Sequence, residues 1–250
     1  LEFITNEFNI NPKPNLILVV EGDGEEQQFP RLARELLGYS FSILGIEIRN
    51  LKGVGNFTGK KRLDKYGALE KFIDDYHFRQ TIVFIILDNE GRAREIRDSL
   101  IKRPSTTSPG QTVTKGELIR IWARSIEFDN FSNEEIAKAM TELCNHEHEF
   151  NLEEIGKCKT SYDAKKGDPL EDLFEDKATA CIFNKTKLLK ILFDNLISNQ
   201  EKELDENNRR PVVNWLIDAI QLASLNNQPF SNQIKQYNQE SGFLRDKAKY

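Results

Sequence analysis

The hydrophobic residues in the first half of the chain form short continuous runs, separated by stretches in which they recur at helical spacing. Leu16–Val20 and residues 81–91 are runs of the kind found in strands that are covered on both faces. Residues 25–37 place apolar side chains at helical spacing before Gly38, a helix stop signal, and residues 64–76 predict an amphipathic helix. Strands separated by connections that contain helices indicate an α/β fold with a parallel-rich sheet flanked by helices.

The remaining segments complete this organisation. Residues 41–49 predict a second strand, residues 102–117 a surface loop, residues 118–131 a return to strand or edge structure, and residues 184–197 and 210–223 two helices. The expected divisions are a lead-in at 1–13, a core at 14–140, a charged, mostly helical insertion at 141–178, C-terminal helices at 179–225 and a polar tail at 226–250.

Carboxylates follow the two clearest strands. Glu21 comes directly after Leu16–Val20, with Glu25 a turn later, and Asp88 and Glu90 end the second run. The carboxyl edge of an open α/β sheet is where ligands bind. Four acids gathered there would repel each other unless a divalent cation neutralised them, and Mg²⁺ or Mn²⁺ prefers oxygen ligands. The alternative is that these acids lie on loops and at helix N-termini, where they are favourable without a metal.

Composition narrows the classes of function. The 250 residues carry a net charge of −5, which argues against nucleic-acid binding by bulk charge but leaves room for local basic patches. Three cysteines provide no disulfide framework, so a reducing, cytoplasmic setting is expected. No apolar run approaches the roughly 20 residues of a membrane span. The sequence therefore predicts a soluble protein without a membrane partner.

A basic, glycine-rich stretch follows the second predicted strand. The stretch GVGNFTGKKR resembles a phosphate-binding loop, but its spacing is wrong and Lys61 stands where Ser or Thr would hold Mg²⁺. Lys52, Lys60, Lys61 and Arg62 are better interpreted as a basic rim that contacts DNA phosphates, with a solvated loop as the alternative.

A zinc site is the second alternative chemistry. Cys144, His146, His148 and Cys158 are the residue types that bind zinc, but their spacing fits no common zinc pattern. A charged surface segment is the preferred interpretation.

The sequence VVEGDGEE, followed about 65 residues later by FIILDNEG, resembles the TOPRIM domain of topoisomerases, primases and related nucleases. The family pattern is a strand ending in Glu-Gly and a later strand ending in Asp-x-Asp. This chain departs from the pattern because Glu90 occupies the second acid position, which adds a methylene group and changes the metal spacing.

The stretch RSIEFDNF resembles the later acidic motif of OLD (overcoming lysogenization defect) nucleases, and the likeness covers roughly residues 14–200. The resemblance implies that Ser125 and Glu127 line a two-metal site and that a helix lysine completes it, with Lys185 as the best match and Lys187 as the second. It assigns Glu21 as general base or metal ligand, and Glu25, Asp88, Glu90 and Glu127 as ligands of Mg²⁺ or Mn²⁺. Lys185 would stabilise charge on the scissile phosphate, with a solvated helix lysine as the alternative. Asp129 and Glu26 are spare acids.

The implied function is a metal-dependent DNA endonuclease in bacterial defence against phage, acting by nicking or by double-strand cleavage. In the OLD family this region follows an ABC-type ATPase domain. The start Leu1-Glu2-Phe3, without methionine, predicts a fragment with vector-derived residues or a stand-alone effector with a separate ATPase. Homo-oligomerisation stays open. The alternatives are a topoisomerase or primase domain, and a non-catalytic TOPRIM module for assembly or nucleotide sensing.

Overall fold

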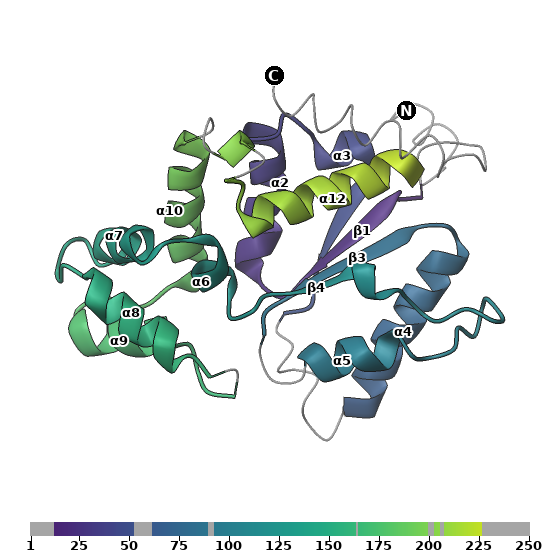
Figure 1. Ribbon diagram of the computed structural model, residues 1–250, viewed down its shortest axis with the longest axis horizontal. Coiled ribbons are helices and arrows are strands. Elements are labelled where there is room, and N and C mark those ends of the chain that lie inside the picture. The colour runs from purple at the N-terminus through teal and green to yellow at the C-terminus, as the bar shows by residue number, and fades with distance from the viewer. Residues whose placement is uncertain are drawn as a thin grey trace.

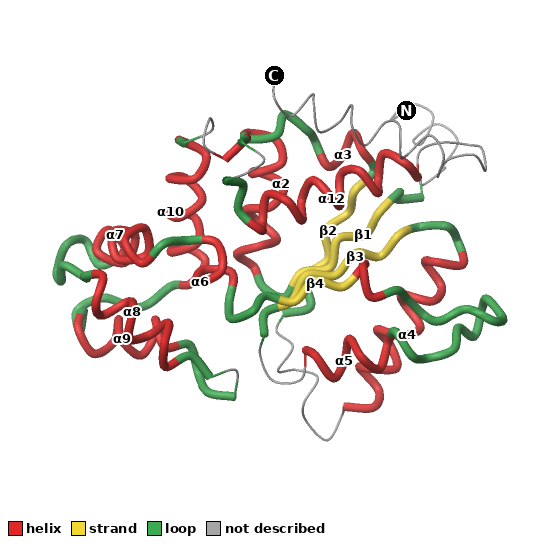
Figure 2. The backbone as a smooth tube through the Cα atoms, in the orientation of Figure 1, coloured by secondary structure: helices red, strands yellow, loops and turns green. Residues whose placement is uncertain are grey.

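A parallel sheet organises the chain, as the computed structural model shows for residues 13–52, 62–89, 93–163, 165–199, 203–205 and 208–226. The four described strands lie in the order β2-β1-β3-β4, and every neighbouring pair is parallel (Figure 2). Their bounds are β1 Leu16–Val20, β2 Ile46–Asn50, β3 Ile82–Leu87 and β4 Ile119–Ile121. The predicted α/β fold with a parallel sheet is confirmed.

Alternate residues of the central strands enter two separate apolar cores. Leu16, Leu18 and Val20 of β1 contribute to one core, while Ile17 and Val19 contribute to the other. This alternation follows from the two-residue period of a strand. Because both faces are covered, the strand has no polar position, which explains the continuous apolar run in the sequence.

Helices cover the two faces unequally. Figure 1 shows α2, α3 and α12 on one side of the sheet and α4 and α5 on the other, with α6 to α10 gathered beyond one end of the strands. The bounds are α2 Asp23–Glu35, α3 Phe41–Leu44, α4 Arg62–Phe78, α5 Ala93–Leu100, η2 Gly116–Leu118, α6 Ile126–Asn130, α7 Asn133–Leu143, α8 Leu152–Ser161, α9 Pro169–Lys177, α10 Lys185–Ser198 and α12 Pro211–Asn226.

The strand predicted over residues 41–49 is wrong in its first half. Residues Phe41–Leu44 form α3, a single helical turn, and only Ile46–Asn50 pair as β2. Gly45 ends the turn with a left-handed φ of 67°, and its carbonyl accepts a hydrogen bond from the Asn15 amide at 2.8 Å. A Cβ at this position would stand 2.5 Å from the Asn15 side chain, so both the conformation and the close approach require glycine.

The strand or edge structure predicted over residues 118–131 is also only partly correct. Pairing with β3 covers Ile119–Ile121, and the chain then turns into the short helix α6, Ile126–Asn130. The Ser125 hydroxyl accepts a hydrogen bond from Phe128 N and caps this helix. The break therefore follows from a capping serine six residues after the last core residue of the strand, Ile119.

The charged segment 141–178 contains two ordered helices. Asn151 begins α8 with a reciprocal capping box to Glu154, and Asp168 caps α9 ahead of Pro169 at the first helical turn. Ile155 of α8 and Phe174 of α9 are fully buried in the same apolar core as one face of the sheet. Helices α8 and α9 therefore pack against the same core as the sheet.

Asp74 of α4 anchors the loop that follows α5. Its carboxylate accepts hydrogen bonds from the Ser105 hydroxyl at 2.5 Å, from Thr106 N at 2.8 Å and from Thr107 N at 3.2 Å. Burial alone would raise the pKa of Asp74, but these hydrogen bonds outweigh it and lower the pKa to about 2.

Replacement of this anchor should reduce stability in a pH-dependent way. The Asp74→Asn variant places an amide group against donors, so we expect it to lose about 1–3 kcal/mol of unfolding free energy at neutral pH. Because the folded pKa is depressed from 3.8, the contribution of Asp74 is present above pH 4 and is lost as the pH falls toward 2. Urea unfolding at pH 7, 4 and 2.5 measures the effect. A gap between parent and variant that does not narrow at acidic pH would contradict this role.

Among the described residues, none of the helices is long and apolar enough to cross a membrane.

Candidate active site

Two acids meet where the adjacent strands β1 and β3 end. Glu21 directly follows β1 and Asp88 directly follows β3. The Glu21 carboxylate accepts a hydrogen bond from the Asp88 backbone amide at 3.0 Å, and both residues are buried. The strand-end acids that the sequence singled out are therefore in direct contact, and Glu21 has a structural role as well as a carboxylate charge.

The first turn of α2 brings a third acid to this edge. Glu25 is 5% exposed and lies near Asp88, whose charge acts on it. Helix α2 packs closely against α10 here, since a Cβ on Gly24 would stand 2.4 Å from the Leu189 side chain. The glycine thus permits the helix that carries Glu25 to approach the helix that carries Lys185.

The short helix α6 carries a fourth acid, Glu127. The Ile126 amide donates to the Asp88 carboxylate at 3.2 Å, which fixes the start of α6 to the end of β3. Glu127 is fully buried, and neither of its carboxylate oxygens has a hydrogen-bond partner among the described residues. Buried polar atoms of this kind are rare and call for an explanation.

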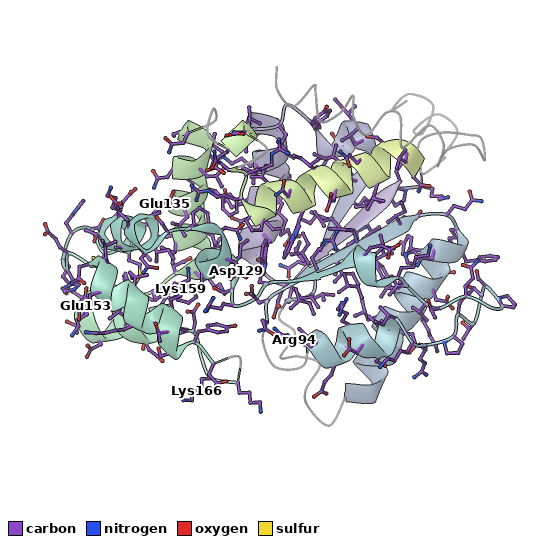
Figure 3. The ribbon with its side chains drawn as sticks, viewed as in Figure 1. Arg94, Asp129, Glu135, Glu153, Lys159 and Lys166 are labelled. Atoms are coloured by element: carbon purple, nitrogen blue, oxygen red, sulfur yellow. The ribbon has the colours of Figure 1, made fainter. Side chains whose placement is uncertain are left out.

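Contacts from three directions hold α6 in place. The Asn130 carboxamide bonds to Ile126 O at 2.8 Å and accepts from Val212 N at 2.7 Å. Lys159 of α8 donates to Phe128 O of α6 at 2.9 Å; Lys159 and the next residue of α6, Asp129, are labelled in Figure 3. Asp129 accepts from the Arg124 amide at 3.2 Å. This acid, expected to be a solvated spare, stabilises the turn before α6.

Lys185 stands among the acids at the first position of α10. Its ammonium lies 3.2 Å from Asp88 Oδ2, 3.8 Å from Glu127 Oε1 and 3.7 Å from Asp168 Oδ2. Lys187, the second match, is exposed on the same helix. The structure therefore brings Lys185, and not Lys187, to the acids.

Asp168 was missed from the sequence. In the structure Asp168 caps α9, Pro169–Lys177, and Pro169 lies in the first turn of this helix. Nothing in the local pattern indicated that this helix start lies against α10.

The electrostatics of the cluster are those of crowded, desolvated carboxylates. Burial, reinforced by the charge of Asp88, raises the pKa of Glu25 well above its usual range. Burial also raises the pKa of Glu127; Asp168 and Asp88 act in the same direction, and Lys185 opposes them. Burial would lower the pKa of the Lys185 ammonium, but Glu127, Asp88 and Asp168 together raise it well above the usual value. One ammonium therefore balances several acids.

A cavity of about 410 Å³ opens onto this cluster. Its lining residues are Glu21, Gly22, Asp23, Gly24, Glu25, Lys52, Asp88, Lys185, Thr186 and Leu189. Lys52, predicted as a DNA contact, reaches this wall with a left-handed φ of 54°. Glu127 is fully buried and is not among the residues that line the cavity.

The donors of the cluster are of the type that a hard divalent cation prefers. All the acidic ligand atoms are carboxylate oxygens. The two buried oxygens of Glu127 accept no hydrogen bond from the described residues, and a cation could take the place of the missing hydrogen-bond donors. No group of three or more Asp, Glu, His or Cys among the described side chains is arranged so that it could hold a metal ion. Glu90, a predicted ligand, lies outside the described residues. The donors are present, with the Lys185 ammonium standing among them.

The other predicted residues divide into three groups. Lys60 and Lys61 lie outside the described residues, as does the side chain of Arg62 at the start of α4. Ser125 is buried as the cap of α6. Glu26, the second spare acid, accepts a hydrogen bond from the Asn50 side chain at 2.9 Å.

The residues of the zinc alternative have separate partners. The Cys144 thiol donates to Thr141 O at 3.3 Å, and the Cys158 thiol donates to Pro169 O at 3.3 Å. The His148 ring lies 3.3 Å from Glu154 and packs edge-on against Phe150. His146 has a left-handed φ of 63° in the turn after α7. These contacts belong to the packing of α7, α8 and α9.

Comparisons with known proteins returned solved structures only. No protein-family profile matches the sequence, and no curated protein matches it. The C-terminal region of the Burkholderia pseudomallei OLD protein is similar at 16% identity and a TM-score of 0.49, over 84% of this chain and 98% of that one. The C-terminal region of the Xanthomonas campestris pv. campestris OLD protein is similar at 17% identity and a TM-score of 0.48, over 83% and 94%.

Both solved structures are C-terminal regions of OLD proteins, and OLD is the family that the sequence motifs resemble. Identities and TM-scores of this size carry no functional assignment. What this chain does has to be inferred from its own side chains.

Proposed function

We propose that this chain is a metal-dependent phosphodiester hydrolase that cleaves DNA, with Mg²⁺ or Mn²⁺ held by the acids at the carboxyl edge of the sheet. One observation carries the proposal: Glu21, Glu25, Asp88 and Glu127 come from three separate parts of the chain and converge on one lysine beside a cavity. Folding gathers buried like charges at a cost, which is typical of functional sites.

The acids have distinct roles in this proposal. Asp88 and Glu25 face the cavity and would hold the first ion, and Glu127 would serve it from the buried side. Two divalent ions held by these acids would lower the pKa of a bound water and would stabilise the leaving oxygen. Glu90 would complete the ligand set.

Glu21 would accept a proton from the attacking water, and Lys185 would stabilise negative charge on the scissile phosphate. The Glu21 carboxylate lies at the cavity wall, fixed by the Asp88 amide, and would accept the proton of the attacking water. The Lys185 ammonium is held in place before substrate binds, so it would stabilise negative charge on the scissile phosphate without a reorganisation cost. Lys52, on the cavity wall, would contact a neighbouring phosphate of the DNA.

The wider context is also proposed. An ABC-type ATPase domain or subunit as partner and a role in defence against phage rest on the sequence motifs alone, as does the choice of DNA as substrate. Nicking and double-strand cleavage are separated by the products of the test below.

The test combines a plasmid assay with melting curves. We expect the parent to convert supercoiled plasmid to nicked or linear forms in Mg²⁺ or Mn²⁺ and not in chelator. The Glu127→Gln variant should lose most of the metal-induced stabilisation, about 2.7 kcal/mol at a hundredfold excess over Kd, because an amide is a weak ligand for a hard cation. Glu134→Gln, which removes an exposed acid of α7, is the matched control.

The outcomes discriminate between functions. Cleavage and metal-induced stabilisation that persist in Glu127→Gln would overturn the role of Glu127. A parent that binds metal but cleaves neither alone nor with an ATPase partner would favour the non-catalytic TOPRIM module.

A further inference from the structure

Among the described residues, Asp168 is the carboxylate of the helical segment 141–178 that forms an ion pair with Lys185. It belongs to the start of α9, and its Oδ2 atom lies 3.7 Å from the Lys185 ammonium. Its two other ion-pair partners among the described residues, Asp88 and Glu127, belong to the strand end and to α6. Lys185 is thus shared between the sheet edge and the helical segment.

The inference rests on the proposed function, which assigns two of the three ion-pair partners of Lys185 to metal binding and leaves the third without that role. Asp88 and Glu127 are assigned to a divalent cation, whose charge repels the ammonium that they hold without metal. Asp168 has no such second role. Asp168 can therefore still pair with the Lys185 ammonium when Asp88 and Glu127 bind the metal ion.

We propose that Asp168 is the positioning residue of Lys185, and that it keeps the ammonium at the site when metal is bound. The helical segment thereby becomes part of the active site, because the position of α9 determines where Lys185 can act. Lys185 has a side chain that is 36% exposed, so without an anchor it has room to swing toward solvent.

The geometry of the cap allows the charge to be removed alone. Asp168 Oδ1 accepts from Leu170 N at 3.0 Å and caps α9, while the other oxygen faces Lys185. Asparagine is as good a cap as aspartate. Asp168→Asn therefore keeps the helix start and removes the partner of the lysine. Asp172→Asn, at an exposed acid one turn further along α9, is the matched control.

Two measurements test the positioning role. We expect Asp168→Asn to lower the single-turnover cleavage rate by about 10- to 100-fold, the cost of a misplaced group, with little change in KM for DNA. In the Lys185→Ala background the same change should have no further effect. Modification of Lys185 by an amine-reactive ester, quantified by mass spectrometry with and without Mg²⁺, should rise severalfold in Asp168→Asn and stay at the parental rate in Asp172→Asn.

The cleavage rates and the modification of Lys185 can each overturn the positioning role of Asp168. An equal loss of cleavage in the Lys185→Ala background would overturn the inference, because Asp168 would then act independently of the lysine. Unchanged modification of Lys185 would overturn it as well. If the parent neither binds metal nor cleaves, the proposed function fails, and a severalfold rise in modification without metal still supports Asp168 as the anchor.

Discussion

Lys185→Ala is expected to lower DNA cleavage by about 10²- to 10³-fold, the loss typical for removal of one preorganised group that stabilises transition-state charge. The ammonium is fixed 3.2 Å from Asp88 before substrate arrives, so its contribution needs no rearrangement. Metal-induced stabilisation should persist, or increase, because lysine is not a ligand and its charge opposes a cation. Cleavage rates and melting curves with and without Mn²⁺ separate these effects.

The same variant should weaken the metal-free protein. Asp88 and Glu127 would lose a cationic partner while remaining buried. Because Lys185 is about one-third exposed, solvent screens the pair, and we expect about 1 kcal/mol of lost unfolding free energy. Lys187→Ala, at an exposed lysine of the same helix, is the matched control and should leave both properties unchanged. If the two variants lose cleavage equally, Lys185 is not the lysine of the site.

Replacement of Glu21 should have the largest effect on cleavage. We expect both Glu21→Gln and Glu21→Ala to lower the rate by about 10²- to 10⁴-fold, the contribution of a positioned general base. If Glu21 were an exposed strand-end acid, Glu21→Ala would leave stability unchanged or raise it, because the change relieves like-charge repulsion. The structure argues against this, since Glu21 is buried and accepts the Asp88 amide.

The two substitutions at Glu21 therefore differ in stability. Glutamine keeps an acceptor for the Asp88 amide and relieves like-charge repulsion, so Glu21→Gln should match the parent in chemical unfolding. Glu21→Ala leaves that amide unpaired and should cost about 1–3 kcal/mol. Glu26→Gln alters the acid that bonds to Asn50 and serves as the control. Parental cleavage by Glu21→Gln would remove Glu21 from the proposed chemistry.

The elements that could be predicted are those determined by local pattern. The runs in β1 and β3 are apolar throughout because both of their faces are covered, so they are visible without any knowledge of neighbours. Glu21 and Asp88 follow those runs directly, and the parallel arrangement of two adjacent strands was enough to bring them together. Lys185 was reached by resemblance, and the structure distinguishes it from Lys187.

The elements that were missed depend on distant contacts. The left-handed Gly45 breaks an otherwise strand-like stretch because Asn15, thirty residues earlier, approaches its carbonyl. Asp168 is readable as a helix cap, but its proximity to Lys185 arises from the packing of α9 near the start of α10. Helix α6 begins where Asp88 binds the Ile126 amide, a contact across 38 positions. These three contacts join residues that are far apart in the sequence, so the local sequence pattern does not predict them.

A crystal soaked in Mn²⁺ and measured at the manganese absorption edge tests the central claim directly, because it locates the ion without relying on activity. We predict an anomalous peak beside the cavity, within about 2.0–2.4 Å of a carboxylate oxygen of Asp88 and of at least one of Glu21, Glu25, Glu90 and Glu127. A peak at His146 and His148 with none among these acids would contradict the claim, as would a saturated crystal with no peak at the carboxyl edge of the sheet.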